Sequence, residues 1–261
     1  MAQWNGMTSH SHWSRGDFVQ DTSALYKQIY SSRNYKVETV LAIGNQTPQT
    51  AYTEEDIISL STSKRVFQNN YPEVGCCICG EIDISMYMPS EDIPRQAMLV
   101  PWVRLVSTED GSYSEWLKKG VYFIDTRQNT KNRDNMAVLT IHGMDAMIKT
   151  EQLYPSTTLE FPTTPLQLAD DIASKIGTVV DSRCRQHLNK NYEVPYPSNY
   201  TMREALSQIG LAIGGNWIMN DIGELQFIPL WELPKETNLL IDNVGYRIVF
   251  GVDPNDARIL V

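Results

Sequence analysis

Three of the four cysteines crowd into one stretch, GCCICGEIDIS, where thiolates could hold a metal ion. They are Cys76, Cys77 and Cys79, while Cys184 lies far along the chain. A structural zinc site typically takes four ligands in two spaced pairs, which this spacing does not supply. We therefore expect no metal and no disulfide, as suits a reducing cytosol. Instead, alternation predicts one strand from Cys76 to Met88, with cysteine as a small strand residue.

Other residue types that could support catalysis are not arranged as a site. Cys184 and His187 could be nucleophile and base, but they lie in a polar loop with no orienting third residue. Adjacent helix residues point apart, so a paired-carboxylate site is not expected at Asp170-Asp171. We also interpret His142 as structural and Glu54-Glu55-Asp56 as a solvated run, and set aside His10, His12 and Trp13 on an N-terminal arm.

No Gly-x-Ser-x-Gly, P-loop or His-Glu-x-x-His motif occurs. Gly214-Gly215 is expected to end a helix and not to bind phosphate. We therefore predict no catalytic, cofactor-binding or metal-binding residue, no cofactor and no enzymatic activity.

Composition excludes two further classes of protein. The 261 residues are 42% hydrophobic and 20% charged, with a net charge of −9, which is ordinary for a folded domain or two. No dense Lys/Arg cluster is present, whereas phosphate contacts dominate nucleic-acid affinity. A membrane span needs about 20 apolar residues, and no such run occurs, so we expect no membrane span.

The elements that would position these residues centre on Gly120 to Pro155. Alternation predicts strands at Val121–Thr126 and Met136–His142, and the polar segment Arg127–Asn135 reads as their connection. One or two helical turns should follow from Asp145 and stop before Pro155.

The N-terminal half reads as sheet. After an arm (1–22), a helix is expected near Ser23–Tyr30. Strands should follow at Val37–Ile43, Glu54–Thr62, Cys76–Met88 and Met98–Val106. Pro101 argues for an edge or a bulge, and Asp110-Gly111 is a turn pair. Six or seven strands favour an antiparallel β-barrel or sandwich as the first domain (23–152).

A small α+β domain is predicted over 153–230. Thr164-Pro165-Leu166-Gln167 and Thr201-Met202-Arg203-Glu204 both resemble capping boxes that open helices. Gly177 should end the first helix, and a hairpin should join Asn216–Met219 to Glu224–Pro229. Residues 231–261 then regain strand character, at Tyr246–Phe250 and Ile259–Val261. They would start a second β-barrel or complete the first.

Several segments together resemble tail hub proteins of phages and prophages of Gram-positive bacteria, including the N-terminal part of tail-associated lysins. They are LYKQIYSSRNYKVE (25–38), GEIDISMYMPSEDIPRQAMLVPWVRL (80–105), SEWLKKGVYFIDTR (114–127), MDAMIKTEQLYP (144–155) and YTMREALSQIGLAIGGNWIMNDIGELQFIPL (200–230). The family is similar in turn to the trimeric hub of T-even-type contractile tails.

The resemblance implies a structural baseplate hub: a homotrimer that joins the tail tube, or distal tail protein, to the tip or spike. It would surround a channel through which DNA passes without specific binding. Its place would be the virion tail, assembled in the bacterial host cytoplasm. The alternative is the N-terminal assembly part of a tail-associated peptidoglycan hydrolase whose catalytic domain is absent from this chain.

Overall fold

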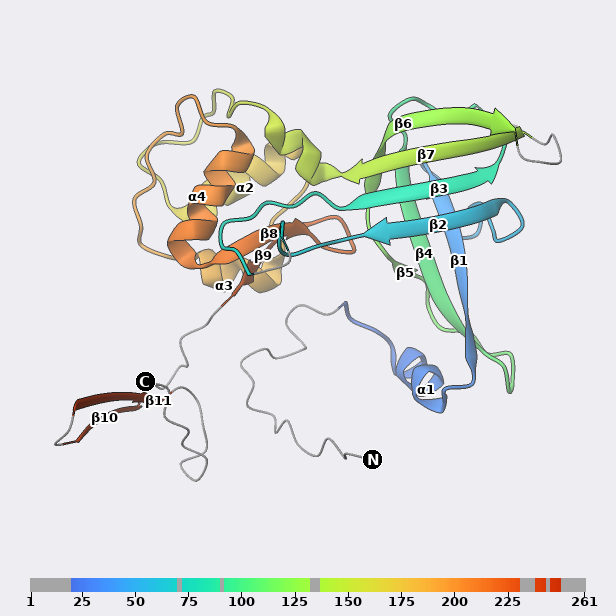
Figure 1. Cartoon of the computed structure of the whole chain (residues 1–261), viewed down its shortest axis with the longest axis horizontal. Coiled ribbons are helices and arrows are strands. Elements are labelled where there is room, and N and C mark those ends of the chain that lie inside the picture. Colours follow the sequence, from blue (N-terminus) through green and yellow to red (C-terminus); the bar gives the residue numbers. More distant parts are fainter. Residues whose placement is uncertain are drawn as a thin grey trace.

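The computed structural model describes residues 20–69, 72–89, 92–131 and 137–230, together with the backbone of two strands at 238–242 and 245–249. A large sheet lies beside a smaller unit of helices and a hairpin (Figure 1). The molecule is mostly antiparallel β with a few helices, which confirms the predicted class.

The large sheet has seven strands, and all their pairings are antiparallel. They are β1 (Tyr35–Ile43), β2 (Ile57–Ser63), β3 (Glu81–Tyr87), β4 (Met98–Ser107), β5 (Leu117–Lys118), β6 (Tyr122–Lys131) and β7 (Ala137–Asp145). Their order is β1-β4-β6-β7-β3-β2, with β5 on β4. No described ladder joins β1 to β2, so the expected closed barrel is not found, and the sheet is open.

The hairpin β6–β7 is longer than its sequence indicates. Arg127 pairs with Ile141 and Lys131 pairs with Ala137. Residues 127–131, which were expected in the connection, therefore belong to strand β6. These β6 residues are exposed, and without a buried face they carry no apolar alternation. Met136 and the tip of the expected connection lie outside the described residues.

Pro101 is not on an edge strand, because β4 lies between β1 and its other neighbours. The partner of β4 changes beside this proline: Leu99 pairs with β6, and Trp102 pairs with β5. The Pro101 carbonyl accepts from Lys119 N–H on that same side. The missing proline N–H therefore faces the break between two partners, where it interrupts no continuous ladder.

One face of the sheet carries a core of buried side chains. They are Leu41, Ile43, Ile82, Ile84, Met86, Ile93, Ala97, Leu99, Tyr122, Ile124, Leu139 and Ile141. Complete burial of such a side chain contributes about 1.5–3 kcal/mol. The alternation predicted for Tyr122, Ile124, Leu139 and Ile141 is confirmed by this placement.

Helix α1 (Ala24–Ser32) lies at the far end of β1 and β4 (Figure 1). Ser23 caps it by accepting from Tyr26 N–H, and Arg33 ends it in the left-handed conformation. Glu115 accepts hydrogen bonds from both the N–H and the hydroxyl of Ser23. These contacts tie the start of α1 to the segment before β5.

The smaller unit has the predicted α+β order. It contains α2 (Pro165–Ile176), the 3-10 turn η2 (Ser182–Cys184), α3 (Arg185–Leu188), α4 (Met202–Ile213), β8 (Gly215–Met219) and β9 (Leu225–Pro229). Both capping boxes form, at Thr164/Gln167 and Thr201/Glu204. Gly177 and Gly214 end the helices with positive φ, which glycine adopts without a Cβ clash. These local predictions are confirmed.

The two units are joined by more than one segment. The 3-10 turn η1 (Ala146–Glu151) follows β7 directly, and Ala146 and Met147 pack into the core of the smaller unit. Residues 75–80, between β2 and β3, also cross to β8. The domain boundary at residue 153 stays a prediction. Beyond Leu230, β10 (Asn238–Asp242) and β11 (Gly245–Val249) form a two-stranded ladder; Ile259–Val261 lies outside the described residues.

Candidate functional site

The cysteine stretch lies in the crossing segment and not in β3, so the predicted strand from Cys76 is wrong in its first half. Gly75 N–H donates to Gly215 O, Trp217 N–H donates to Cys76 O, and Ile78 N–H donates to Trp217 O. The segment is extended because it runs parallel to β8, with a bridge at Cys77 and Trp217. Alternation indicated extended backbone but could not say which sheet it joined.

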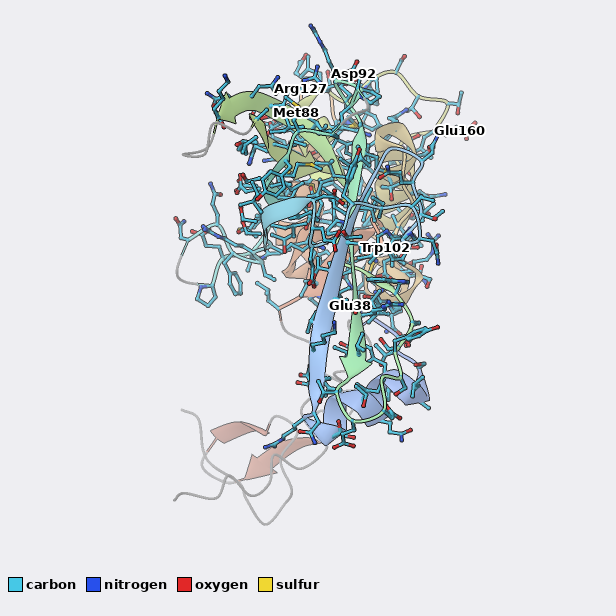
Figure 2. All side chains as sticks on the ribbon, turned by 90° about the vertical axis from the view of Figure 1, so that its right-hand side faces the viewer. Glu38, Met88, Asp92, Trp102, Arg127 and Glu160 are labelled. Carbon is cyan, nitrogen blue, oxygen red and sulfur yellow. The ribbon has the colours of Figure 1, made fainter. Side chains whose placement is uncertain are left out.

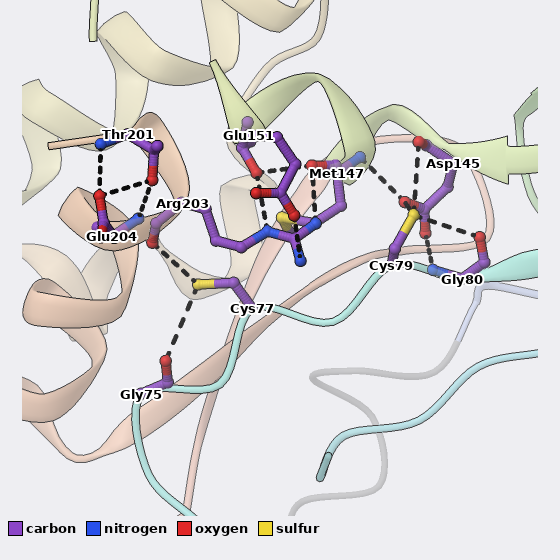
Figure 3. Close-up of polar contacts among 11 residues, drawn as sticks. Gly75, Cys77, Cys79, Gly80, Asp145, Met147, Glu151, Thr201, Arg203 and Glu204 are labelled. Atoms are coloured by element: carbon purple, nitrogen blue, oxygen red, sulfur yellow. Dashed lines mark hydrogen bonds and ion pairs between the residues drawn. The ribbon is translucent and has the colours of Figure 1, made fainter. Parts of the chain in front are cut away.

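A buried carboxylate holds the point where this segment meets β7 (Figure 3). Asp145, only 2% exposed, accepts from Gly80 N–H at 2.7 Å through Oδ2. Its Oδ1 accepts from Met147 N–H at 2.9 Å and from the Cys79 thiol at 3.2 Å. Burial raises the pKa of this carboxyl, and the two backbone N–H groups oppose the rise. Asp145 thus joins β3, β7 and η1 at one point.

Arg203 on α4 makes a second link to η1 (Figure 3). Its guanidinium forms an ion pair with Glu151 at 2.9 Å and donates to Met147 O at 3.3 Å. The Cys77 thiol lies 3.6 Å from the Arg203 carbonyl. Burial raises the pKa of both the Cys77 and Cys79 thiols, which disfavours the thiolate that metal binding or nucleophilic attack requires.

A third link is electrostatic. Asp221, in the β8–β9 turn, contacts Lys64 at 2.7 Å and Lys119 at 3.3 Å. Burial opposes ionisation of Asp221, but the two lysines prevail and lower its pKa. Sequence reasoning missed all three links, because the partners are far apart in the chain and no motif relates them.

Of the remaining catalytic candidates, Cys184 is held as a structural group. Cys184 is fully buried, with its Sγ 3.1 Å from Asp181 O and 3.4 Å from Phe227 N. Burial raises the pKa of this thiol to about 11, so it is a poor nucleophile at neutral pH. His187 lies on α3, which follows directly, so both residues are in short helical turns and the expected polar loop at this point is wrong.

The adjacent aspartates diverge as expected. Asp170 accepts two hydrogen bonds from Arg185, and Asp171 accepts from Tyr154 and Thr157 hydroxyls. They therefore form no paired-carboxylate site.

His142 pairs with Asp83 across two strands at 3.0 Å. Asp56 accepts from Thr53 N–H and closes a turn before β2, whereas the expected strand began at Glu54.

His10, His12 and Trp13 lie outside the described residues. In the described part of the chain, no three His, Cys, Asp or Glu side chains are grouped to hold a metal ion, and no helix there is long and apolar enough to cross a membrane.

The surface best suited to an interaction is the β1 end of the open sheet. β1 pairs with β4 on one side. On its other side, the backbone of Leu41 exchanges hydrogen bonds with Tyr52 in an isolated bridge. From Tyr35 up to Leu41, no described strand pairs with this side of β1. Val37 on this edge is 49% exposed. Such an edge offers backbone donors and acceptors to another strand.

A cluster of aromatic and charged side chains lies on the outer face of β1 and β4, the two strands on which Figure 2 labels Glu38 and Trp102. Arg104 on β4 forms an ion pair with Glu38 on β1 at 2.7 Å. Its guanidinium lies 4.6 Å from the Tyr113 ring and 4.5 Å from the Trp116 ring. Tyr113 is 60% exposed. An arginine that is ion-paired and lies over aromatic rings is the kind of group that protein interfaces favour.

The architecture is an open antiparallel sheet carrying a small α+β unit and an unpaired edge. No protein-family model matches the sequence, and no curated protein matches it. Among solved structures, this chain is similar to the 43 kDa tail protein of prophage MuSo2 from Shewanella oneidensis. The TM-score is 0.50 and the identity 16%, and the match covers 78% of this chain and 59% of that one.

Two further solved structures are more distant. The tail protein from Neisseria meningitidis MC58 has a TM-score of 0.45 at 15% identity, covering 74% of this chain and 51% of that one. A chain of the Francisella PdpA-VgrG complex has a TM-score of 0.42 at 7% identity, covering 78% and 34%. The shared fold rests on the first match alone, and this chain spans 59% of the length of that tail protein.

Proposed function

We propose that this chain is a structural component of a phage or phage-like tail: a baseplate hub that joins the tail tube to the tip or spike and surrounds a central channel. The observation that carries the proposal is the fold shared with a prophage tail protein over 78% of the chain. The segments that resemble tail hubs support it independently. Its place would be the virion tail, after assembly in the bacterial host cytoplasm.

The unpaired edge of the sheet supports assembly of several copies, and the number three comes from the resemblance to trimeric hubs. An edge such as β1 is a liability in a monomer, because its unpaired backbone groups can recruit another chain. In a closed ring, β1 would pair with the opposite edge strand, β2, of the next copy, which satisfies the backbone groups of both edges. The exposed Val37 and Tyr113 and the Arg104 cluster lie beside this edge, so side chains would add contacts to the backbone pairing.

The net charge of −9 supports a channel that does not retain DNA. A duplex is bound tightly where lysines and arginines neutralise several phosphates, and the sequence contains no dense cluster of them. A genome would therefore pass through the hub without specific binding.

The experiment is to locate the protein in assembled particles. Gold-labelled antibody against this chain should mark the tail tip, and cryo-electron microscopy should show three copies in a ring. Label on the capsid, or a single copy per particle, would contradict the hub. Zymography on peptidoglycan should show no lysis by this chain, which also tests its non-enzymatic role.

A further inference from the structure

A pocket of about 520 Å³, lined mostly by polar and charged residues, lies against the hairpin β8–β9, on the side away from the core of the smaller unit. On β9, Leu225 and Phe227 point into that core, so Gln226 between them points to the opposite face. The other walls come from the segment before α1, from η2 and from Lys64. The site thus draws on segments far apart in the sequence, including Gln20, Asp21, Asp181, Arg183 and Glu224.

The charge of the lining is negative. Four carboxylates, from Asp21, Asp181, Asp221 and Glu224, line the pocket with two cations, Lys64 and Arg183. Lys119, outside the lining, also contacts Asp221, so the excess is one negative charge. Lys64 is bound to Asp221, and Arg183 is bound to Asp181 at 2.7 Å. The excess therefore lies with Asp21 and Glu224, whose charges both act on Arg183. A cationic group in the pocket would balance them.

Two buried amide atoms in the lining have no hydrogen-bond partner among the described residues. Gln226 is 3% exposed and its Nε2 donor is unpaired; the Gln20 Oε1 acceptor is likewise buried and unpaired. Leaving a buried polar atom unpaired costs about 1–3 kcal/mol. A peptide group could satisfy both atoms, because its C=O would accept from the Gln226 donor and its N–H would donate to the Gln20 acceptor.

We propose that this pocket binds an arginine side chain on an extended segment of a partner protein. The guanidinium lies between the Asp21 and Glu224 carboxylates, where its planar set of donors suits carboxylate acceptors. The main chain of the segment accepts from Gln226 Nε2 and donates to Gln20 Oε1. The proposal does not depend on the tail role, because a chain that is not a hub would still bind such a segment.

The test is titration of the full chain, labelled with nitrogen-15, with the capped tripeptide acetyl-Gly-Arg-Gly-amide. The side-chain amide signal of Gln226 should shift with a Kd of about 1–10 mM, the affinity range of a small ligand. The matched probe with citrulline has the same shape without the charge and should bind about tenfold more weakly. Free arginine, which lacks the peptide groups, should also bind more weakly. Equal binding of either control would overturn the proposal, as would no shift of Gln226 at 50 mM tripeptide, about five times the weakest affinity expected.

Variants separate recognition from folding. Glu224→Gln keeps an acceptor for Asn220 but removes the charge, and should weaken binding about tenfold. Gln226→Met removes the unpaired donor at similar length, so it should weaken binding while Tm stays equal or rises. Glu160→Gln, an exposed change away from the lining, is the control and should bind normally. Unchanged binding by both Glu224→Gln and Gln226→Met would overturn the site.

Discussion

The Cys79 thiol lies 3.2 Å from the buried Asp145 carboxylate, and the same carboxylate accepts the N–H groups of Gly80 and Met147. One side chain thereby links the crossing segment, the end of β7 and the start of η1. Because η1 packs into the core of the smaller unit, the position of that unit on the sheet depends on this carboxylate.

Asp145→Asn should therefore destabilise the protein. The asparagine amide can keep one acceptor, but its NH₂ group would face an N–H donor and leave a buried group unpaired, at a cost of about 1–3 kcal/mol. Urea unfolding followed by tryptophan fluorescence would measure the loss. Asp110→Asn, on an exposed turn, is the control. An unchanged unfolding midpoint in Asp145→Asn would show that the junction does not need the carboxylate.

The pH dependence of the same residue gives a second prediction. Burial raises the pKa of folded Asp145 above its unfolded value of about 3.9. A raised folded pKa gives a contribution to stability that is complete below the unfolded value and is lost as pH rises through the folded one. The advantage of wild type over Asp145→Asn should therefore be larger at pH 4 than at pH 7. An advantage that grows with pH would contradict the direction of the shift.

All four cysteines should be free thiols that react slowly in the folded protein. Burial raises the pKa of each, and for Cys184 it does so to about 11. With a thiol reagent at pH 8, the native protein should react slowly and the urea-unfolded protein should yield four groups at once. Fewer than four after unfolding without reductant would indicate a disulfide, and one stoichiometric zinc by elemental analysis would contradict the prediction.

Leu206→Ala tests the core of the smaller unit. Leu206 on α4 is fully buried, and large-to-small changes in a core cost about 2–5 kcal/mol. Leu211 lies on the same helix but is 52% exposed, so Leu211→Ala is a matched control and should change stability little. Thermal melts of both variants decide the matter. Equal effects would mean that the apolar stripe on α4 is not what stabilises the helix.

The features foreseen from sequence are the local ones. Thr164 and Gln167 are only three residues apart and meet across one helical turn, so their capping box can be recognised in the sequence. The same holds for Thr201 and Glu204. The end of β6 was missed because its exposed residues have no buried face to reveal a strand. Closure of the sheet could not be foreseen either, because a barrel and an open sheet share the same alternation.

The three links between the large sheet and the smaller unit could not be predicted from the sequence for a different reason. Lys64 and Asp221 are separated by most of the chain, and only the fold brings their charges to 2.7 Å. Cys76 to Cys79 show a related limit. An extended segment alternates in the same way whichever strand it lies against, so the pattern that indicated β3 also fits pairing with β8.

The last prediction concerns the edge of β1. If copies of the chain pair there, Val37→Lys should place a charge and a long polar chain where two edges meet, as natural proteins do to prevent such pairing. Val37 is exposed within the monomer, so Tm of the isolated chain should be unchanged. The matched control is Val179→Lys, on an exposed valine of the smaller unit. Mass photometry of the full-length protein, and incorporation into tail particles, should show loss of the trimer for Val37→Lys and not for Val179→Lys. A trimer that tolerates Val37→Lys would place the interface elsewhere, whereas one copy per particle in the wild type would contradict the hub itself.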